Sequence, residues 1–244
     1  MRITYRKIEI KMIKGYIFDY GGTLDTEGHH WGKVLWHSYQ RQNVPVTEEQ
    51  FREAYVYGER TLGNVPIIKP NYTFYKTLDT KLRLEMEYIC SSGFWDAGED
   101  ELMSMKKAVL DDVYSYVKKV TDHSRDVLEK LHVNYPMVLV SNFYGNVGVV
   151  LKEFKLDHLF LAIVESAVVG IRKPDPRIYK LGVEELGLQP DEVVVVGDSF
   201  YKDIEPANKI GCKTIWFKGE GWTDKVYDET LPDRIITDIA QILQ

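Results

Sequence analysis

Residues 16–25 read Tyr16-Ile17-Phe18-Asp19-Tyr20-Gly21-Gly22-Thr23-Leu24-Asp25, a short apolar run that leads into a glycine-containing turn. An apolar run bounded in this way predicts a buried strand. Asp19 ends that strand, so its carboxylate is expected at the edge of a sheet. In parallel sheets with helical crossovers, this edge is where active-site residues gather. The segment therefore predicts both a fold class and a position for the chemistry.

The remainder of the pattern comes after residue 121, where strand-like runs alternate with helical periodicity. The runs are Met137–Val140, Leu161–Val164, Val193–Val196, Lys213–Phe217 and Arg234–Ile236. Apolar residues at three-to-four-residue spacing mark helices at Asp122–Val133, Asn146–Leu156, Asp175–Leu188 and Tyr201–Ile210, with Gly187 and Gly211 as helix stops. With Gly15–Asp19 as the first strand, the alternation predicts an α/β fold with a doubly wound, Rossmann-like parallel sheet.

Residues 28–120 interrupt this alternation. They hold few β-branched runs and much helical periodicity, as in Met103–Val120. A segment of this length is far too long to be an ordinary connection. We expect an inserted α-helical cap domain over residues 28–120, an α/β core over residues 12–27 and 121–244, and an N-terminal tail over residues 1–11.

Composition narrows the functional classes. The formal net charge is −6, which argues against general binding to nucleic acid or anionic membranes, because both need a cationic surface. Cys90 and Cys212 are the only cysteines, so a disulfide framework is not expected. No run of apolar residues approaches a membrane span, and no export signal is evident. A cytoplasmic protein is expected, while the sequence does not fix its oligomeric state.

Three further motifs follow later predicted strands in the same way that Asp19 follows the first. They are Val140-Ser141-Asn142, Arg172-Lys173-Pro174-Asp175-Pro176, and Gly197-Asp198-Ser199 with Asp203-Ile204 and Ala207. Together with residues 16–25, and in this order, they resemble the four signature motifs of the haloacid dehalogenase superfamily. Most members of that family are magnesium-dependent phosphatases. The resemblance covers residues 15–24 and roughly 122–217, and the inserted region resembles the family's cap by position and character only.

Asp19 is the expected nucleophile, because a carboxylate can attack phosphorus in line and form an aspartyl phosphate. Mg²⁺ prefers hard oxygen ligands and a substrate phosphate to complete its shell. The resemblance implies that Asp19, the backbone carbonyl of Gly21 and Asp198 bind Mg²⁺ directly, and that Asp203 binds it directly or through water.

The remaining motif residues are expected to contact the phosphate. In the family pattern, Lys173 neutralises both the nucleophile and the phosphate. The resemblance implies that Ser141 and the backbone after it, at Asn142, donate hydrogen bonds to phosphate oxygens. The expected substrate is accordingly a small phosphorylated metabolite, with a phosphoric monoester or an acyl phosphate as the bond that is cleaved.

Gly21 departs from the family pattern, which usually has a second Asp at this position to protonate the leaving oxygen and then activate water. General acid–base catalysis is worth roughly 10²–10⁴-fold, so we expect Gly21 to weaken or redirect the activity and not to end it. Three rescues are open: a substrate with a good leaving group, a proton donor from elsewhere such as His29 or His30, or a substrate that supplies its own proton.

Other readings remain open at this stage. A phosphonatase-like branch of the family uses a cap lysine as Schiff base, for which Lys33 and Lys69 are candidates. Metal-independent dehalogenases also lack the second Asp but usually carry a bulky residue there. A catalytically silent phosphate-binding relative is the third alternative. Aromatic residues of the inserted region either line a substrate pocket or pack inside the cap; they are Trp31, Trp36, Tyr39, Phe94 and Trp95.

Overall fold

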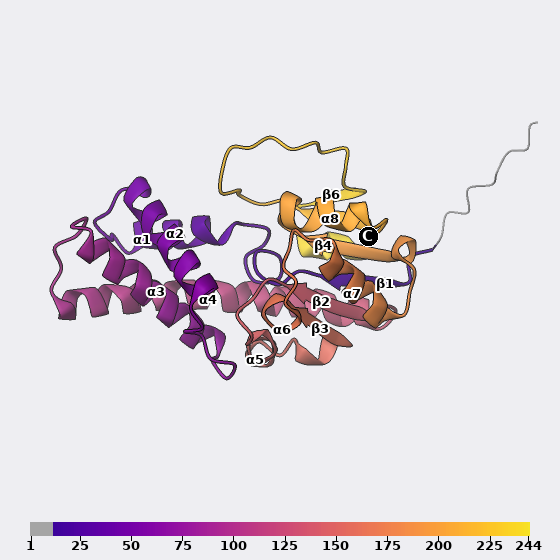
Figure 1. Cartoon of the computed structure of the whole chain (residues 1–244), viewed down its shortest axis with the longest axis horizontal. Coiled ribbons are helices and arrows are strands. Elements are labelled where there is room, and N and C mark those ends of the chain that lie inside the picture. Colours follow the sequence, from indigo (N-terminus) through magenta and orange to yellow (C-terminus); the bar gives the residue numbers. More distant parts are fainter. Residues whose placement is uncertain (1–11) are drawn as a thin grey trace, which may run out of the picture.

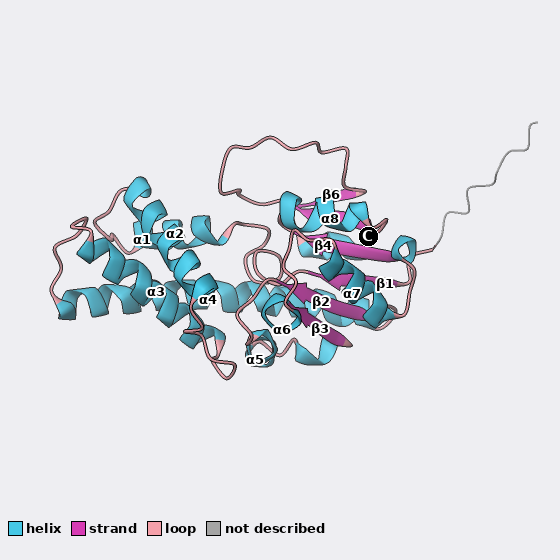
Figure 2. Ribbon diagram, viewed as in Figure 1, coloured by secondary structure: helices cyan, strands magenta, loops and turns pink. Residues whose placement is uncertain are grey.

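The computed structural model describes residues 12–244, so the expected tail at residues 1–11 lies outside the described residues. Its centre is a six-stranded sheet in which every pairing is parallel. The strands are β1 (Gly15–Phe18), β2 (Met137–Ser141), β3 (Ala162–Glu165), β4 (Val193–Gly197), β5 (Lys213–Phe217) and β6 (Arg234–Ile236). Figure 2 shows them side by side with helices on both faces. The predicted α/β fold with a parallel sheet is confirmed.

The strand order, β3-β2-β1-β4-β5-β6, places β1 at the switch point of the doubly wound sheet. From β1 the chain first builds outward through β2 and β3, then returns to build the other side through β4. Phe18 pairs with Leu139 of β2 and with Val196 of β4. Asp19 therefore lies between the ends of two neighbouring strands, at the crevice where ligands bind in open α/β sheets.

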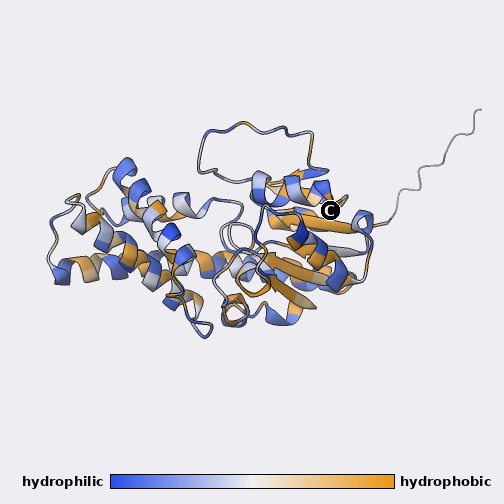
Figure 3. Cartoon of the chain, in the orientation of Figure 1, coloured by the Kyte–Doolittle hydropathy of each residue, from blue (hydrophilic) through white to orange (hydrophobic). Residues whose placement is uncertain are grey.

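Alternate residues of the strands feed two separate cores, because successive side chains of a strand point to opposite faces. Phe18, Leu139 and Val196 belong to the larger core, and Ile17, Val138 and Val195 to the smaller one. Both faces are covered by helices, so the strands are nearly continuous runs of Val, Ile and Leu (Figure 3). Burial on both faces fixes the positions of the strand ends that carry the site.

Four helices form a body beside the sheet: α1 (Trp31–Arg41), α2 (Glu48–Asn64), α3 (Phe74–Ser91) and α4 (Glu99–His132). Figure 1 shows α1, α2 and α3 clustered away from the strands. Thr47 and Gln50 form a capping box at the start of α2, and Thr73 caps α3. This is the helical segment expected between residues 28 and 120, and its role as a cap stays a prediction.

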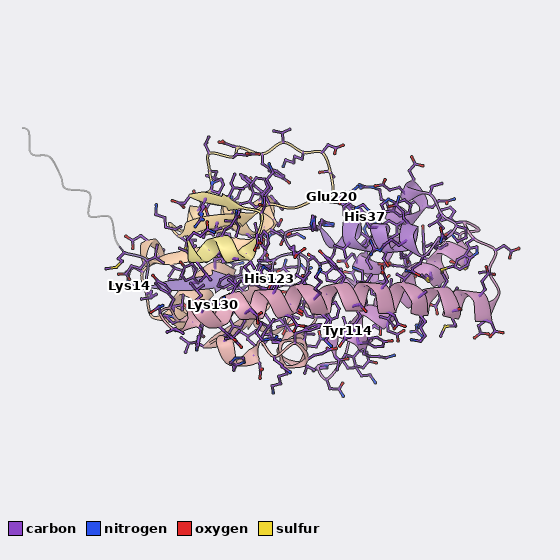
Figure 4. All side chains as sticks on the ribbon, turned by 180° about the vertical axis from the view of Figure 1, so that it is seen from behind. Lys14, His37, Tyr114, His123, Lys130 and Glu220 are labelled. Atoms are coloured by element: carbon purple, nitrogen blue, oxygen red, sulfur yellow. The ribbon has the colours of Figure 1, made fainter. Side chains whose placement is uncertain are left out.

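α4 differs from the expectation of separate helices at 103–120 and 122–133. It is one continuous helix that runs from the helical body to the sheet (Figure 4). Its buried stripe continues through Val117, Val120, Thr121 and Ser124 without a break. No Gly or Pro occurs between residues 99 and 132, so nothing in the sequence stops the helix there.

The remaining helices are short and connect or cover the strands. They are α5 (Val147–Glu153), α6 (Ser166–Val169), α7 (Arg177–Leu186) and α8 (Glu205–Lys209), with a π-helical turn at Phe200–Ile204 and 3₁₀ turns at Asp157–Leu159, Pro190–Glu192 and Ile239–Leu243. Gly187 ends α7 in the left-handed conformation, as expected of a helix stop. Within residues 12–244, no helix combines the length and the apolar character needed to cross a bilayer.

Candidate active site

The centre of the site is a buried ion pair between Lys173 and Asp19. The Lys173 Nζ donates to Asp19 Oδ1 at 2.6 Å and to Asp203 Oδ1 at 2.8 Å. All three side chains are nearly inaccessible to solvent. Burial alone would lower the pKa of Lys173, but the two carboxylates outweigh it and raise the pKa, so the ammonium stays charged.

Asp203 is held in place by three elements. Besides Lys173, its Oδ1 accepts from the Tyr179 hydroxyl at 2.6 Å, and its Oδ2 accepts from the Ser199 backbone N–H at 2.9 Å. Gly197 makes room for it, because a Cβ at position 197 would lie 2.4 Å from the Asp203 Cβ. Both oxygens of Asp203 are thus engaged in orienting the lysine and the turn after β4.

Asp198 is joined to the first strand end by Thr23. The Thr23 hydroxyl lies 3.1 Å from Asp198 Oδ1 and 3.2 Å from Asp19 Oδ2, and the Asp198 backbone N–H donates to it at 3.0 Å. Gly22 has a φ of +104°, and a Cβ there would lie 2.4 Å from Asp198 Cγ. Only glycine fits this position, which explains the Gly22-Thr23 pair of the turn.

Asp19, Asp198 and Asp203 bring three carboxylate oxygens within 4.8 Å of one another. Burial raises the pKa of Asp19, with Lys173 opposing and Asp203 adding to the increase. Burial, Asp203 and Asp19 raise the pKa of Asp198 well above its usual range. Such a cluster of hard oxygen donors, held near one another at an energetic cost, fits a divalent cation, which would favour the charged forms.

Asn142 and Ser141 have different positions relative to this cluster. The Asn142 side chain forms two hydrogen bonds with the backbone of Lys173. Its Oδ1 accepts from Lys173 N–H at 2.9 Å, and its Nδ2 donates to Lys173 C=O at 3.1 Å. Asn142 also lines the cavity described below, whereas Ser141 does not. The Ser141 hydroxyl is buried without a hydrogen-bond partner among the described residues. Binding of phosphate by Ser141 stays a prediction.

A cavity of about 160 Å³ opens onto the cluster between the sheet edge and the helical body. Its apolar wall is formed by Trp31, Tyr55, Phe74, Leu78, Phe143 and Tyr144. Of the five aromatic residues expected either here or in a cap core, Trp31 lines the cavity. Tyr39 and Trp95 are buried among core residues, and Trp36 and Phe94 pack against that core. Lys33 and Lys69, the candidate Schiff-base lysines, are not among the residues that line the cavity.

Gly21 lines the cavity, and the nearest atom to a Cβ built on it would be Trp31 Nε1 at 3.7 Å. Asp25 lines the cavity too and is fully buried. Its Oδ1 accepts from the Gly22 N–H at 2.7 Å, and its Oδ2 has no partner among the described residues. Burial raises the pKa of Asp25 well above its usual range, and the Gly22 N–H and the Trp31 indole oppose that increase only in part.

The two candidate histidines lie in different surroundings. His30 lines the cavity and caps α1, since its Nδ1 accepts from Gly32 N–H at 3.0 Å. Burial lowers its pKa to about 4, so its ring is neutral near pH 7 and holds no dissociable proton of useful acidity. His29 does not line the cavity, and its Nδ1 accepts from the Glu220 N–H at 2.8 Å.

The loop between β5 and β6 reaches across to the helical body, where it contacts His30, a residue that lines the cavity. Trp222 stacks on His30 with ring centroids 5.1 Å apart, and the Arg52 guanidinium lies 3.9 Å from the Trp222 ring. Glu220 pairs with His37 of α1 at 2.7 Å, and Figure 4 shows the two side chains meeting. Nothing in the sequence pattern marked this loop as part of the site.

Comparison with known proteins decides the family. The family model of haloacid dehalogenase-like hydrolases matches residues 13–211, which is most of the chain. The chain is a haloacid dehalogenase-like hydrolase. The resemblance inferred from the four motifs is therefore confirmed, and the relatives of this hydrolase include phosphatases.

A glyceraldehyde 3-phosphate phosphatase of Pyrococcus furiosus is 36% identical to this hydrolase over 92 residues, covering 37% of the chain and 38% of that protein. Among solved structures, a dehalogenase has a TM-score of 0.60 at 18% identity, covering 94% of this chain and 95% of that one. A predicted phosphoglycolate phosphatase of Haemophilus somnus 129pt has a TM-score of 0.56 at 22% identity, covering 96% and 98%. These two structures establish the fold alone.

The matches to curated relatives are partial: they span 38%, 27% and 54% of the length of three glyceraldehyde 3-phosphate phosphatases. The family is therefore established for this hydrolase, while its substrate has to be argued from the site.

Proposed function

We propose that this hydrolase is a Mg²⁺-dependent phosphatase that acts on a small phosphorylated metabolite through an aspartyl phosphate at Asp19. One observation carries the proposal: Lys173 bonds to both Asp19 and Asp203, while Asp198 completes a trio of carboxylates beside them. A buried nucleophile, a buried cation and a set of hard oxygen ligands at one end of a cavity are the parts that phosphoryl transfer needs, since it depends mainly on positioning and charge neutralisation.

The reaction proceeds in two steps at Asp19. One carboxylate oxygen of Asp19 bonds to phosphorus while the bond from phosphorus to the leaving oxygen breaks, and that oxygen takes up a proton. Water then attacks the phosphorus of the aspartyl phosphate, which releases phosphate and restores the carboxylate. Lys173 offsets the repulsion between the anionic nucleophile and the anionic phosphate, and Asn142 fixes the lysine backbone that carries it.

The metal would be held by Asp19 and Asp198, with the Gly21 carbonyl as a further ligand and Asp203 acting directly or through water. Mg²⁺ in this position would supply electrostatic stabilisation of the charge that develops on the phosphoryl oxygens. Thr23 keeps the Asp19 and Asp198 carboxylates at their relative positions, since its hydroxyl contacts both. Because both oxygens of Asp203 already accept hydrogen bonds, its main task is to orient Lys173.

Asp25 is the residue that best replaces the acid missing at position 21. It is a cavity carboxyl whose raised pKa favours the protonated form, and its Oδ2 accepts no hydrogen bond of normal geometry within residues 12–244, although the Trp31 indole is near enough to oppose the rise in pKa. A Cβ at position 21 would lie 3.7 Å from Trp31 Nε1, and the same indole opposes the rise in the pKa of Asp25. Positions 21 and 25 therefore both lie beside Trp31. Asp25 would hand its proton to the leaving oxygen and recover one from the attacking water.

The cavity, with a volume of about 160 Å³, suits a small substrate. The phosphatase relative from Pyrococcus furiosus supports a phosphorylated three-carbon compound as a starting point for the search. A phosphorylated metabolite is preferred over a haloacid because a metal-independent displacement would have no use for three clustered carboxylates.

The decisive experiment is a substrate panel assayed with Mg²⁺ and with chelator. It includes p-nitrophenyl phosphate, acetyl phosphate, glyceraldehyde 3-phosphate and 2-chloropropionate, with Asp19→Asn as the matched control. Release of phosphate that needs Mg²⁺ and disappears in Asp19→Asn is expected. Chloride release in the presence of chelator would assign the chain to the dehalogenases instead. Binding of inorganic phosphate without turnover of any compound would identify a silent relative.

A further inference from the structure

Two exposed cationic side chains line the cavity without a side-chain partner among residues 12–244. Arg172 and Lys202 both line the cavity, and neither forms a side-chain hydrogen bond or ion pair with any described residue. Each is the neighbour in sequence of a residue of the catalytic cluster, Lys173 in one case and Asp203 in the other. They reach the cavity from two separate segments, the loop before α7 and the π-helical turn after β4.

The other cations of the cavity are already neutralised. Lys173 is paired with Asp19 and Asp203, and Lys81 is paired with Glu59 of α2. Glu59 also accepts from the Tyr144 hydroxyl at 3.4 Å. Arg172 and Lys202 are thus the two lining cations that pair with no carboxylate among residues 12–244, in a cavity whose lining also holds Asp25 and Asp198 outside any ion pair.

These charges act on the interior of the cavity. Lys202 and Lys81 contribute, after burial, to the lowered pKa of His30, and Lys202 contributes to the lowered pKa of Glu59. Burial raises the pKa of Tyr144, and the positive charge of Arg172 opposes this increase. Three residues that line the cavity, His30, Glu59 and Tyr144, thus experience the positive charge of Lys202 or Arg172, which an anionic ligand near these two side chains would also meet.

We propose that Arg172 and Lys202 bind a carboxylate on the part of the substrate that leaves, so that the substrate is a phosphorylated carboxylic acid. The inference rests on the proposed function, because it places the phosphate of the same molecule at Lys173. The aromatic wall formed by Trp31, Phe74 and Phe143 would pack against the carbon chain between the two anions. An arginine suits the carboxylate in particular, since its planar guanidinium can bind both oxygens at once.

The test compares two phosphate esters that differ in one group, 3-phosphoglycerate and glycerol 3-phosphate. Calorimetry on the Asp19→Asn protein with Mg²⁺ measures binding without turnover. Tighter binding of 3-phosphoglycerate by at least about tenfold is expected, which corresponds to about 1.4 kcal/mol. Arg172→Gln and Lys202→Met, each added to Asp19→Asn, should each reduce this preference by about tenfold. The affinity for inorganic phosphate should change much less in both.

Lys209→Met in the same background is the control, because Lys209 is an exposed lysine of α8 that does not line the cavity. It removes one positive charge and should leave the preference unchanged. Equal binding of the two esters would overturn the proposal. So would equal weakening of both esters and of inorganic phosphate in the Arg172 and Lys202 variants, which would mean that the two cations only attract phosphate to the cavity.

The same measurements separate this inference from the phosphatase proposal. Preferential binding of 3-phosphoglycerate that depends on Arg172 and Lys202, in a chain whose wild-type form hydrolyses no phosphate ester, would support the carboxylate site and refute the phosphatase. Hydrolysis of glycerol 3-phosphate and 3-phosphoglycerate with equal kcat/KM, together with equal binding, would support the phosphatase and refute the carboxylate site.

Discussion

Lys173 and Asp19 lie 154 positions apart in the sequence, yet their side chains meet at 2.6 Å in the interior of the protein. The contact exists because β1 ends at the switch point of the sheet and because Asn142, at the end of the neighbouring strand, clasps the Lys173 backbone. The same ammonium reaches Asp203, so a single positive charge is shared between a carboxylate after β1 and one in the π-helical turn after β4.

Lys173→Met should therefore damage both stability and activity. Removing one partner of a buried ion pair costs about 3–5 kcal/mol, because the other charge is left uncompensated. We expect urea unfolding without metal to show a loss of this order, and Mg²⁺ to restore part of it by neutralising Asp19 and Asp203. Turnover of p-nitrophenyl phosphate should fall by roughly 10²–10³-fold or more.

Lys180→Met is the matched control, since Lys180 is an exposed lysine of α7. It should leave both properties near their wild-type values. A Lys173→Met protein of unchanged stability would mean that the ion pair seen here is not what compensates the buried carboxylates.

Much of this arrangement could be predicted because it depends on strand ends. Three of its residues come directly after buried strands, namely Asp19, Asn142 and Asp198, and Lys173 lies in the loop between β3 and α7. A parallel sheet brings the carboxyl ends of its strands together at one edge. The helical character of residues 28–120 was also evident from periodicity. The length of α4 was not evident from periodicity. Its buried residues continue at helical spacing past residue 121, although the helix packs on the helical body before that point and near the sheet after it.

Side-chain partners that come from helix interiors or long loops could not be predicted. Tyr179 is an ordinary core position of α7 by its spacing, and only the fold directs its hydroxyl to Asp203. Trp222 lies in a loop with no periodicity, yet its ring covers His30. Asp25 was visible in the first motif, but its raised pKa depends on the burial of the turn and on Trp31, which no local pattern encodes.

Gly21→Asp should be tolerated and should favour poor leaving groups. A Cβ at position 21 meets nothing closer than 3.7 Å, and the backbone there does not need glycine. Adding a carboxyl at position 21 should raise turnover of glycerol 3-phosphate by about tenfold. This is less than the roughly 10²–10⁴-fold of general acid catalysis, because Asp25 already supplies a proton. Turnover of acetyl phosphate should change little, because its leaving group needs no proton.

Gly22→Ala provides the contrast to this variant. Its φ of +104° and the 2.4 Å approach to Asp198 predict a destabilised and inactive protein. Steady-state kinetics on glycerol 3-phosphate and acetyl phosphate, and thermal unfolding of both variants, check these expectations. An equal response of the two substrates to Gly21→Asp would show that protonation of the leaving group does not limit the rate.

Asp25→Asn should change the turnover of glycerol 3-phosphate in the direction opposite to Gly21→Asp. Asparagine keeps an oxygen that can accept from the Gly22 N–H but has no proton of suitable acidity to give. Turnover of glycerol 3-phosphate should fall by about 10²-fold, and that of acetyl phosphate should be nearly unchanged. Adding Gly21→Asp to Asp25→Asn should recover most of the loss. If Asp25→Asn slows the hydrolysis of both substrates equally, Asp25 only holds the turn.

Glu85 of α3 gives the helical body a pH dependence of its own. It is fully buried, its Oε2 accepts from the Tyr39 hydroxyl at 3.2 Å, and its Oε1 has no partner within residues 12–244. Burial raises its pKa from 4.5 to about 7, with Lys81 opposing the increase. The folded protein therefore binds this proton more tightly than the unfolded chain does.

The stability that Glu85 contributes is fully present below about pH 4.5 and is lost as the pH rises through about 7. The full difference between the two pKa values corresponds to about 3 kcal/mol.

Glu85→Gln, which mimics the neutral side chain, should gain stability relative to wild type as the pH is raised from 5.5 to 8. His30 does not confuse the comparison, because its titration is common to both proteins. Urea unfolding at several pH values measures the difference, with Glu87→Gln, an exposed position of the same helix, as the control. A difference between wild type and Glu85→Gln that does not vary with pH would mean that Glu85 is ionised in the folded protein throughout this range.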